Sequence, residues 1–186
     1  DVYKRQNISG ADLVAYSAAV PETNPEMVAA DNCGIARMER SQLLGAITRC
    51  YDNVIGVSGT HGKTTTSTMA AHLLYQSHVG CTAFLGGISK NYGTNLLLSQ
   101  SSPYTVIEAD EFDRSFHWLS PYMSVITATD PDHLDIYGTE EAYLESFRHY
   151  TTLIQPGGAL IIHKDIALKP DVQSGVKVYT YARTEG

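Results

Sequence analysis

Cysteines, positive charge and long apolar runs are all scarce in this sequence, and each shortage excludes a class of protein. The three cysteines, Cys33, Cys50 and Cys81, form no C-x-x-C pair, so neither a disulfide framework nor a zinc site is indicated. We expect three reduced and mostly buried thiols, as in a cytoplasmic protein. No run of about 18 apolar residues is available to span a membrane, and the first residues contain no apolar leader.

The shortage of positive charge bears on the kind of ligand. Lys and Arg number 13 against 20 Asp and Glu, which gives a formal net charge of −7. This balance argues against a general nucleic-acid-binding protein, which needs a basic face. It leaves room for a phosphorylated ligand, because main-chain N–H groups and a single lysine can bind phosphate locally. What is present, 43% hydrophobic residues in a chain of 186, suffices for a sizeable core.

Short apolar runs alternate with helical patterns along the whole chain. Asn24, Pro25 and Glu26 are typical of a helix start, Ser41 is a candidate cap for the next helix, and Thr139 for the last. The predicted strands are 12–16, 35–38, 53–58, 105–109, 123–127, 159–163 and 176–181, and the predicted helices follow residues 24, 41, 63 and 139. This alternation predicts an α/β fold with a largely parallel sheet flanked by helices, and a domain boundary near residue 52.

A Gly-rich turn, GTHGKTTT over 59–66, lies between a predicted strand and a predicted helix that carries Met69, Ala70, Leu73 and Leu74 on one side. Glycines let several N–H groups point at one phosphate, and the helix presents its positive end there. A lysine in the turn reaches the terminal phosphates, and the next hydroxyl binds Mg²⁺. The strict P-loop pattern requires glycine at position 57, which is Val57, so this loop is a variant. The strand before it and the helix after it disfavour a structural turn with an incidental lysine.

Acidic and histidine side chains follow the next predicted strands. Glu108 ends the strand 105–109, at the sheet edge where ligands bind in open α/β folds. The neighbouring cluster, Asp110, Glu111 and Asp113, is by itself more typical of a solvated face. His133 stands between Asp132 and Asp135, which favours a ligand over a purely structural histidine.

Four stretches together resemble the Mur ligases, which build the peptide stem of bacterial peptidoglycan. They are GTHGKTTT at 59–66, EADEFDRSF at 108–116, DPDHLD at 130–135, and YSAAVP at 16–21 followed by NPE at 24–26. The resemblance covers roughly residues 7–170. The loop, with its histidine, resembles the loop of the family branch that acts on UDP-N-acetylmuramate. One position departs from the pattern: Ala128 follows Thr127 where many members have asparagine.

The resemblance implies a domain organisation. Residues 53–186 would be a truncated central ATP-binding domain, P-loop-type with a largely parallel sheet. Residues 1–52 would be the C-terminal remnant of a Rossmann-like N-terminal domain for the UDP substrate. The chain lacks an initiator Met, so we expect an internal fragment without its N- and C-terminal domains, inactive alone. Residues 1–6 fit no predicted element.

The resemblance also implies residue roles. The nucleotide-binding residues would be Gly59, Thr60, His61, Gly62, Lys63, Thr64 and Thr65. Lys63, Glu108 and His133 would be catalytic, and Thr64, Glu108 and His133 would bind Mg²⁺. Because imidazole is softer than the ligands Mg²⁺ usually selects, the site of His133 would tolerate Mn²⁺.

The implied reaction is ATP-dependent formation of an amide between UDP-N-acetylmuramate and L-alanine through an acyl phosphate, in the cytoplasm, without nucleic acid or membrane partners. Two alternatives stay open. One is a recycling ligase that attaches a whole tripeptide to the same UDP sugar. The other is a non-catalytic P-loop nucleotide-binding module, which would need Lys63 and Thr64 but not His133.

Overall fold

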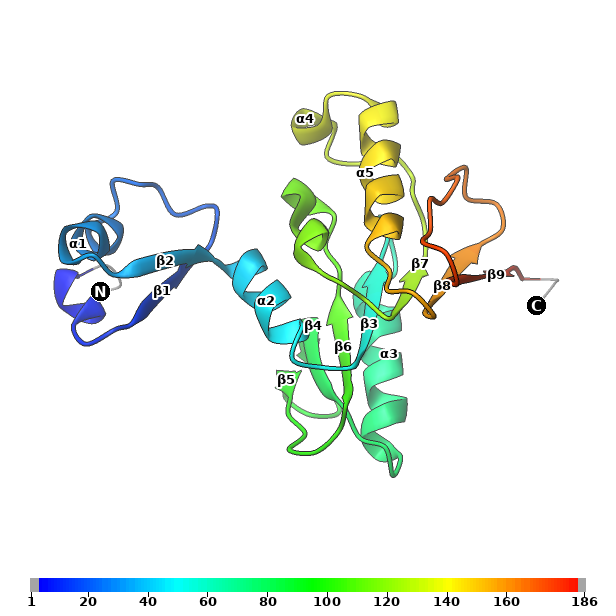
Figure 1. Cartoon of the computed structure of the whole chain (residues 1–186), viewed down its shortest axis with the longest axis horizontal. Coiled ribbons are helices and arrows are strands. Elements are labelled where there is room, and N and C mark those ends of the chain that lie inside the picture. Colours follow the sequence, from blue (N-terminus) through cyan, green and yellow to red (C-terminus); the bar gives the residue numbers. More distant parts are fainter. Residues whose placement is uncertain (1–3, 184–186) are drawn as a thin grey trace.

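A computed structural model describes residues 4–183. The chain begins with a small unit at one side of the molecule (Figure 1). Its parallel strands β1 (Leu13–Tyr16) and β2 (Ala36–Glu39) are joined by helix α1 (Pro25–Cys33), and the 3-10 helix η1 (Arg5–Ile8) packs beside α1. Helix α2 (Arg40–Thr48) leads from this unit to the main sheet. Arg5 and Gln6 thus belong to an element that the sequence did not predict, whereas residues 1–3 lie outside the described part.

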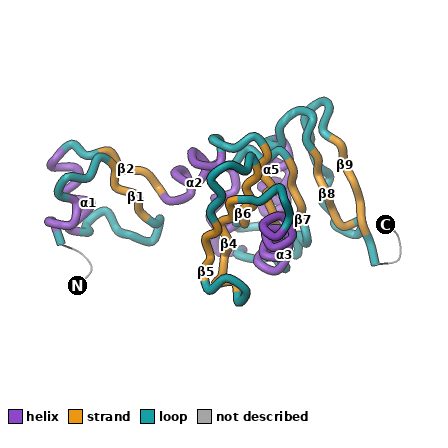
Figure 2. The backbone as a smooth tube through the Cα atoms, turned by 90° about the horizontal axis from the view of Figure 1, so that it is seen from below, coloured by secondary structure: helices purple, strands orange, loops and turns teal. Residues whose placement is uncertain are grey.

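The main sheet has seven strands in the order β5-β4-β6-β3-β7-β8-β9, and only β5 runs antiparallel to its neighbour. Figure 2 shows it as a layer separate from the β1–β2 pair, with β9 at its far edge. This confirms the predicted α/β class with a largely parallel sheet. The strands are β3 (Asn53–Ser58), β4 (Thr82–Ser89), β5 (Thr94–Leu97), β6 (Tyr104–Glu108), β7 (Met123–Ile126), β8 (Ala159–His163) and β9 (Lys177–Tyr181).

Helices cover both faces of this sheet. The main ones are α3 (Lys63–Gln76) and α5 (Glu140–Thr152), and η2 (Phe112–Trp118) and α4 (Leu134–Tyr137) are short. Val54 belongs to the buried cluster of α5, whereas the next residue, Ile55, packs against the cluster of α3. Successive side chains of a strand point to opposite faces, so β3 serves both layers.

The helix starts were predicted with one error. Asn24 and Thr139 cap α1 and α5 as expected, each accepting a hydrogen bond from a main-chain N–H of the first turn. The prediction for Ser41 was wrong, because α2 begins two residues earlier than a helix capped by Ser41 would, and Glu39 is its cap. Gln42 accepts the main-chain N–H of Glu39 at 3.2 Å, which completes a reciprocal cap.

The apolar side of α3 is buried only in part, and the prediction of mostly buried cysteines was wrong. Met69 and Leu73 on α3 are exposed, because the side of α3 that meets the sheet carries the small residues Ser67 and Ala71 instead. Cys33 and Cys50 are exposed because each lies at the end of a short surface helix, and only Cys81 is buried. Burial raises the pKa of the Cys81 thiol to about 11. Within residues 4–183, no helix combines the length and the apolar character that crossing a bilayer requires.

The strand order explains where a site can form. Strand β3 lies between β6 and β7, and all three run parallel. Their carboxyl ends therefore share one edge of the sheet. The loops that follow them, at 59–62, 109–111 and 127–133, meet at that edge although they are far apart in the sequence.

Candidate nucleotide-binding site

The loop after β3 turns sharply into helix α3. Gly59 and Gly62 both have left-handed backbone, with φ of 131° and 84°. A Cβ atom at Gly59 would lie 2.3 Å from Thr127 Oγ1, so only glycine fits beside the next loop. The N–H of Thr60 donates to the carbonyl of Ala128 at 3.0 Å. The departure from the family pattern at Ala128 thus falls where the main chain supports the loop.

The Thr127 side chain forms hydrogen bonds that hold the loop after β3 in place. Its hydroxyl Oγ1 lies 3.1 Å from the carbonyl oxygen of Ser58 and also within hydrogen-bond distance of that of His61. Thr60 is held as well, since its Oγ1 donates to the carbonyl of Asp130 at 2.7 Å and accepts from the hydroxyl of Tyr143 at 2.9 Å. The conformation of the loop is therefore fixed by the segment that follows β7.

Lys63, the first residue of α3, makes two contacts. Its Nζ donates to the carbonyl of Gly59 at 2.8 Å and to Glu111 Oε1 at 2.7 Å. The Glu111 side chain is only 1% exposed, and its other oxygen, Oε2, is buried without a hydrogen-bond partner. Burial raises the pKa of the Glu111 carboxyl, and the hydrogen bond from Lys63 opposes that rise. The expectation that Glu111 lies on a solvated face was wrong, because the loop after β6 turns this side chain inward.

Thr64 and Glu108 meet at the same edge. Thr64 Oγ1 donates to Glu108 Oε1 at 3.0 Å, and the N–H of Gly86 on β4 donates to Glu108 Oε2 at 3.0 Å. A Cβ atom at Gly86 would lie 2.3 Å from that carboxylate. Strand β4 therefore requires glycine where Glu108 approaches it. A hydroxyl beside a half-buried carboxylate is an oxygen donor set of the kind that Mg²⁺ prefers.

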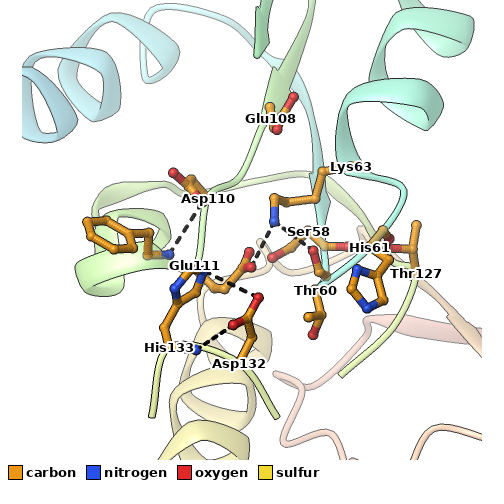
Figure 3. Close-up of polar contacts among 12 residues, drawn as sticks. Ser58, Thr60, His61, Lys63, Glu108, Asp110, Glu111, Thr127, Asp132 and His133 are labelled. Atoms are coloured by element: carbon orange, nitrogen blue, oxygen red, sulfur yellow. Dashed lines mark hydrogen bonds and ion pairs between the residues drawn. The ribbon is translucent and has the colours of Figure 1, made fainter. Parts of the chain in front are cut away.

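His133 lies apart from these two residues. Its ring packs edge to face against Phe112, with centroids 5.1 Å apart, and its Nε2 lies 3.6 Å from Asp132 Oδ2. In Figure 3, Glu108 and His133 lie on opposite sides of the Lys63–Glu111 pair. Among residues 4–183, no three His, Cys, Asp or Glu side chains are grouped as metal ligands. The structure thus brings Thr64 and Glu108 together but not His133, whose role as a metal ligand stays a prediction.

The remaining loop residues differ in exposure. His61, Gly62, Thr64 and Thr65 are exposed, whereas Lys63 and Thr60 are partly buried. The main-chain N–H of Thr66 donates to the carbonyl of Gly62 at 2.9 Å, inside the first turn of α3. The amides before it lie at the start of the helix, where intrahelical acceptors are lacking. Such amides bind anions readily.

Unusual backbone conformations concentrate around the Lys63–Glu111 pair. Within the described residues, three that are not glycine have positive φ: Asp113 at 44°, Arg114 at 63° and His133 at 53°. Each such residue costs on the order of 1 kcal/mol, and such strain persists where surrounding contacts hold it. The guanidinium of Arg114 lies 4.7 Å from the centroid of the Tyr137 ring, and the Tyr137 hydroxyl donates to the carbonyl of Glu111.

Sequence reasoning missed Glu111, Thr127, Tyr143 and Gly86 as parts of the site. Tyr143 is a buried residue of α5, and its hydroxyl also reaches Thr60. The useful signal was the parallel strand order, which places the loops after β3, β6 and β7 side by side. No property of these residues in isolation distinguishes them from ordinary core or loop positions.

Comparison with known protein families identifies the family of this chain. The family model described as the Mur ligase middle domain matches residues 57–186, well over half of the chain. The chain belongs to the Mur ligase family. The matched region contains the phosphate loop, Glu108, Glu111 and His133. The family resemblance inferred from the four sequence stretches is thereby confirmed.

Curated relatives carry one name. A UDP-N-acetylmuramate–L-alanine ligase of Phocaeicola vulgatus is 70% identical over 174 residues, which are 94% of this chain and 38% of that protein. The protein of the same name from Parabacteroides distasonis is 60% identical, over 93% of this chain and 37% of its own length. The chain therefore spans well under half the length of the curated relatives it matches.

Solved structures agree with the fold. The UDP-N-acetylmuramate–alanine ligase MurC of Thermotoga maritima superposes with a TM-score of 0.75 at 27% identity, over 92% of this chain and 39% of that one. A UDP-N-acetylmuramate:L-alanyl-γ-D-glutamyl-meso-diaminopimelate ligase from Neisseria has a TM-score of 0.83 at 23% identity, over 96% and 61%. At that identity the second likeness supports the Mur ligase fold alone.

Proposed function

We propose that this chain is the nucleotide-binding part of an ATP-dependent ligase that joins L-alanine to UDP-N-acetylmuramate. The observation that carries the proposal is the loop 59–65 at the end of β3, with Lys63 in its first helical turn and Thr64 in contact with Glu108. The name shared by relatives at 60% and 70% identity supports the choice of substrates. The activity belongs to the longer protein.

We also propose the division of the chain. Residues 53–186 form the central ATP-binding domain or part of it. Residues 1–52 form the end of the preceding UDP-substrate domain. The separate β1–β2 sheet supports this division, because no strand of that unit pairs with the main sheet in the described part of the chain.

The proposed reaction has two steps. The lactyl carboxylate of UDP-N-acetylmuramate attacks the γ-phosphorus of ATP, which forms an acyl phosphate and releases ADP. The amine of L-alanine then attacks the acyl carbon, and inorganic phosphate leaves as the amide forms and the amine loses a proton. The chain needs no covalent nucleophile, since its task is to hold the phosphates and to stabilise negative charge.

The loop residues have distinct tasks in this proposal. Main-chain amides of His61 to Thr65 hold the phosphates at the start of α3, and Lys63 directs its remaining N–H toward them. Thr60, whose N–H donates to Ala128, fixes the loop. His61 contributes its main chain to the loop. Mg²⁺, or Mn²⁺ in its place, would supply positive charge beside the β- and γ-oxygens. Thr64 and Glu108 fit a hard cation because both offer oxygen, and His133 is the proposed ligand of a second ion.

The proposal is tested on the full-length enzyme that contains this chain. ADP release is measured with UDP-N-acetylmuramate and L-alanine together and with each one omitted. We expect sustained release, beyond one ADP per enzyme, only with both, and its loss in Thr64→Val, which keeps the shape of the side chain but removes the hydroxyl. Sustained ADP release that does not depend on L-alanine would contradict the proposal, as would full turnover in Thr64→Val.

Two further comparisons separate the alternatives. Replacing L-alanine by the tripeptide distinguishes the recycling ligase, which would use the tripeptide better. His133→Ala distinguishes the P-loop module, which needs Lys63 and Thr64 but not His133, so unchanged turnover of the full-length protein in this variant would favour the module. The purified 186-residue chain alone is expected to release no phosphate in response to alanine.

A further inference from the structure

A buried carboxylate of no assigned role faces the loop lysine. Glu111 is 1% exposed and contacts Lys63 Nζ at 2.7 Å through Oε1, while Oε2 is buried and has no partner. An isolated buried carboxylate is costly, and replacing this ion pair by apolar side chains would avoid that cost. Core packing therefore does not explain why a glutamate occupies this position.

The contacts of Lys63 indicate what the glutamate does. An ammonium group has three N–H donors. One is directed to the carbonyl of Gly59 and one to Glu111 Oε1, which leaves a single donor with a fixed direction. Figure 3 shows Lys63 extended from the start of α3 toward Glu111, with the loop beside it. A lysine without these two acceptors would have a mobile four-carbon side chain.

The main chain that carries Glu111 is itself anchored. The Tyr137 hydroxyl and the N–H of Arg114 both donate to the carbonyl of Glu111. The residues that follow, Asp113 and Arg114, have left-handed backbone, and Arg114 is packed on the ring of Tyr137. The segment thus holds Glu111 against Lys63 at some cost in backbone strain.

We propose that Glu111 is a positioning residue: it fixes the ammonium of Lys63 so that its free N–H meets the phosphoryl group during transfer. This rests on the proposed function, because it assumes a nucleotide on the loop. The carboxylate also lowers the net positive charge near the phosphates. Its loss should therefore disturb the alignment of Lys63 without weakening the attraction of ATP.

The test uses the full-length enzyme with five variants, three of them described first. For Glu111→Gln we expect kcat to fall about 10-fold or more, with KM for ATP unchanged or lower. Glu111→Asp keeps the charge but shortens the reach, so its kcat should lie between those of Glu111→Gln and the wild type. Glu141→Gln is the matched control, since it makes the same chemical change at an exposed position of α5, and its kcat should equal that of the wild type.

The double variant separates positioning from simple structural support. Lys63→Ala leaves Glu111 buried and unpaired, so Lys63→Ala/Glu111→Gln should melt at a higher temperature than Lys63→Ala and bind ATP at least as tightly. A Glu111→Gln enzyme with wild-type or higher kcat would overturn the inference. So would a loss of melting temperature on Glu111→Gln that is the same in the wild type as in Lys63→Ala. Failure of the proposed function looks different, because Lys63→Ala would then retain ATP-dependent turnover.

Discussion

The buried layer between α5 and the main sheet is stabilised by different interactions from those at the loop edge of the same sheet. Tyr143, Phe147 and Tyr150 on α5 are fully buried: the rings of Tyr143 and Phe147 meet edge to face, and that of Tyr150 stacks on Phe116. The loop edge holds the Lys63–Glu111 ion pair and the residues with strained backbone. Apolar burial stabilises in proportion to area, whereas a buried ion pair contributes little net stability. The comparison teaches that stability resides mainly under α5 and that the edge is arranged for chemistry.

The largest expected effect is at Lys63. In the full-length enzyme, Lys63→Ala should lower kcat/KM for ATP about 1,000-fold or more, because the charge that stabilises the phosphoryl group in transfer is gone. Steady-state kinetics with ATP as the varied substrate measure this. A loss below about 10-fold would mean that the loop edge is not the catalytic region, and the comparison would fail.

The second largest effect is on the α5 side. Phe147→Ala should lower the free energy of unfolding of the chain by about 3–5 kcal/mol, because it empties a site between the rings of Phe116 and Tyr143. Urea unfolding measures it. Leu73→Ala on the exposed side of α3, where the side chain is 70% exposed, is the control and should change the free energy by less than about 0.5 kcal/mol. Equal losses in the two variants would contradict the assignment of stability to the α5 layer.

Two adjacent glycines on β4 test whether the position of the Glu108 carboxylate matters at the loop edge. Gly86→Ala should lower kcat about 10-fold or more, because its Cβ would displace the Glu108 carboxylate, 2.3 Å away. The neighbouring Gly87→Ala is matched to it: its Cβ would meet Thr64 Cγ2 at an ordinary 3.5 Å. Turnover that falls equally in both variants would show that β4 itself, rather than Glu108, is sensitive.

One hydroxyl joins the two regions. Tyr143→Phe keeps the buried ring but removes the hydrogen bond to Thr60, so it should lower the free energy of unfolding by about 1 kcal/mol and kcat by a small factor. Denaturant titration and steady-state kinetics on the same preparation check both. A variant with altered stability and unaltered kcat would show that the α5 layer does not help to order the loop.

The smallest effect is a pH dependence in the α5 layer. Burial lowers the pKa of His117, whose Nε2 lies 3.0 Å from the carbonyl oxygen of Ser146. The unfolded chain therefore binds more protons below about pH 6.5, and stability should fall as the pH drops from there. Melting temperatures measured from pH 7.5 to 5 should fall less in His117→Gln than in the wild type. Parallel curves would assign the acid sensitivity to other groups.

Much of the sheet could be predicted from the sequence, because buried parallel strands are short apolar runs. The exceptions are β4 and β5, neither of which was predicted; in β4, Gly86 and Gly87 interrupt the apolar run. Glycine is present there because Glu108 on β6 approaches it closely, and that contact is invisible before the strands are paired. The exposed side of α3 was missed for a related reason, since small residues rather than large ones meet the sheet.

The site could be predicted only in part. Glycines, a lysine and a threonine in sequence order identify the phosphate loop, and a carboxylate at a strand end indicates Glu108. The role of Glu111 was beyond sequence reasoning, because an acidic run on a loop is usually solvated and only the turn after β6 buries this member. His133 was predicted from its flanking acids, of which Asp132 does contact it, but this contact does not bring it to Thr64 and Glu108.

The central claim is that the loop 59–65, Lys63, Thr64 and Glu108 together hold the triphosphate. The most direct measurement is a crystal structure of the full-length enzyme with a non-hydrolysable ATP analogue and Mg²⁺. The account predicts the β- and γ-phosphates within hydrogen-bond distance of Lys63 Nζ and of the loop amides, with the metal on Thr64 and Glu108. A nucleotide seated elsewhere, with the Thr64–Glu108 contact unchanged, would contradict it.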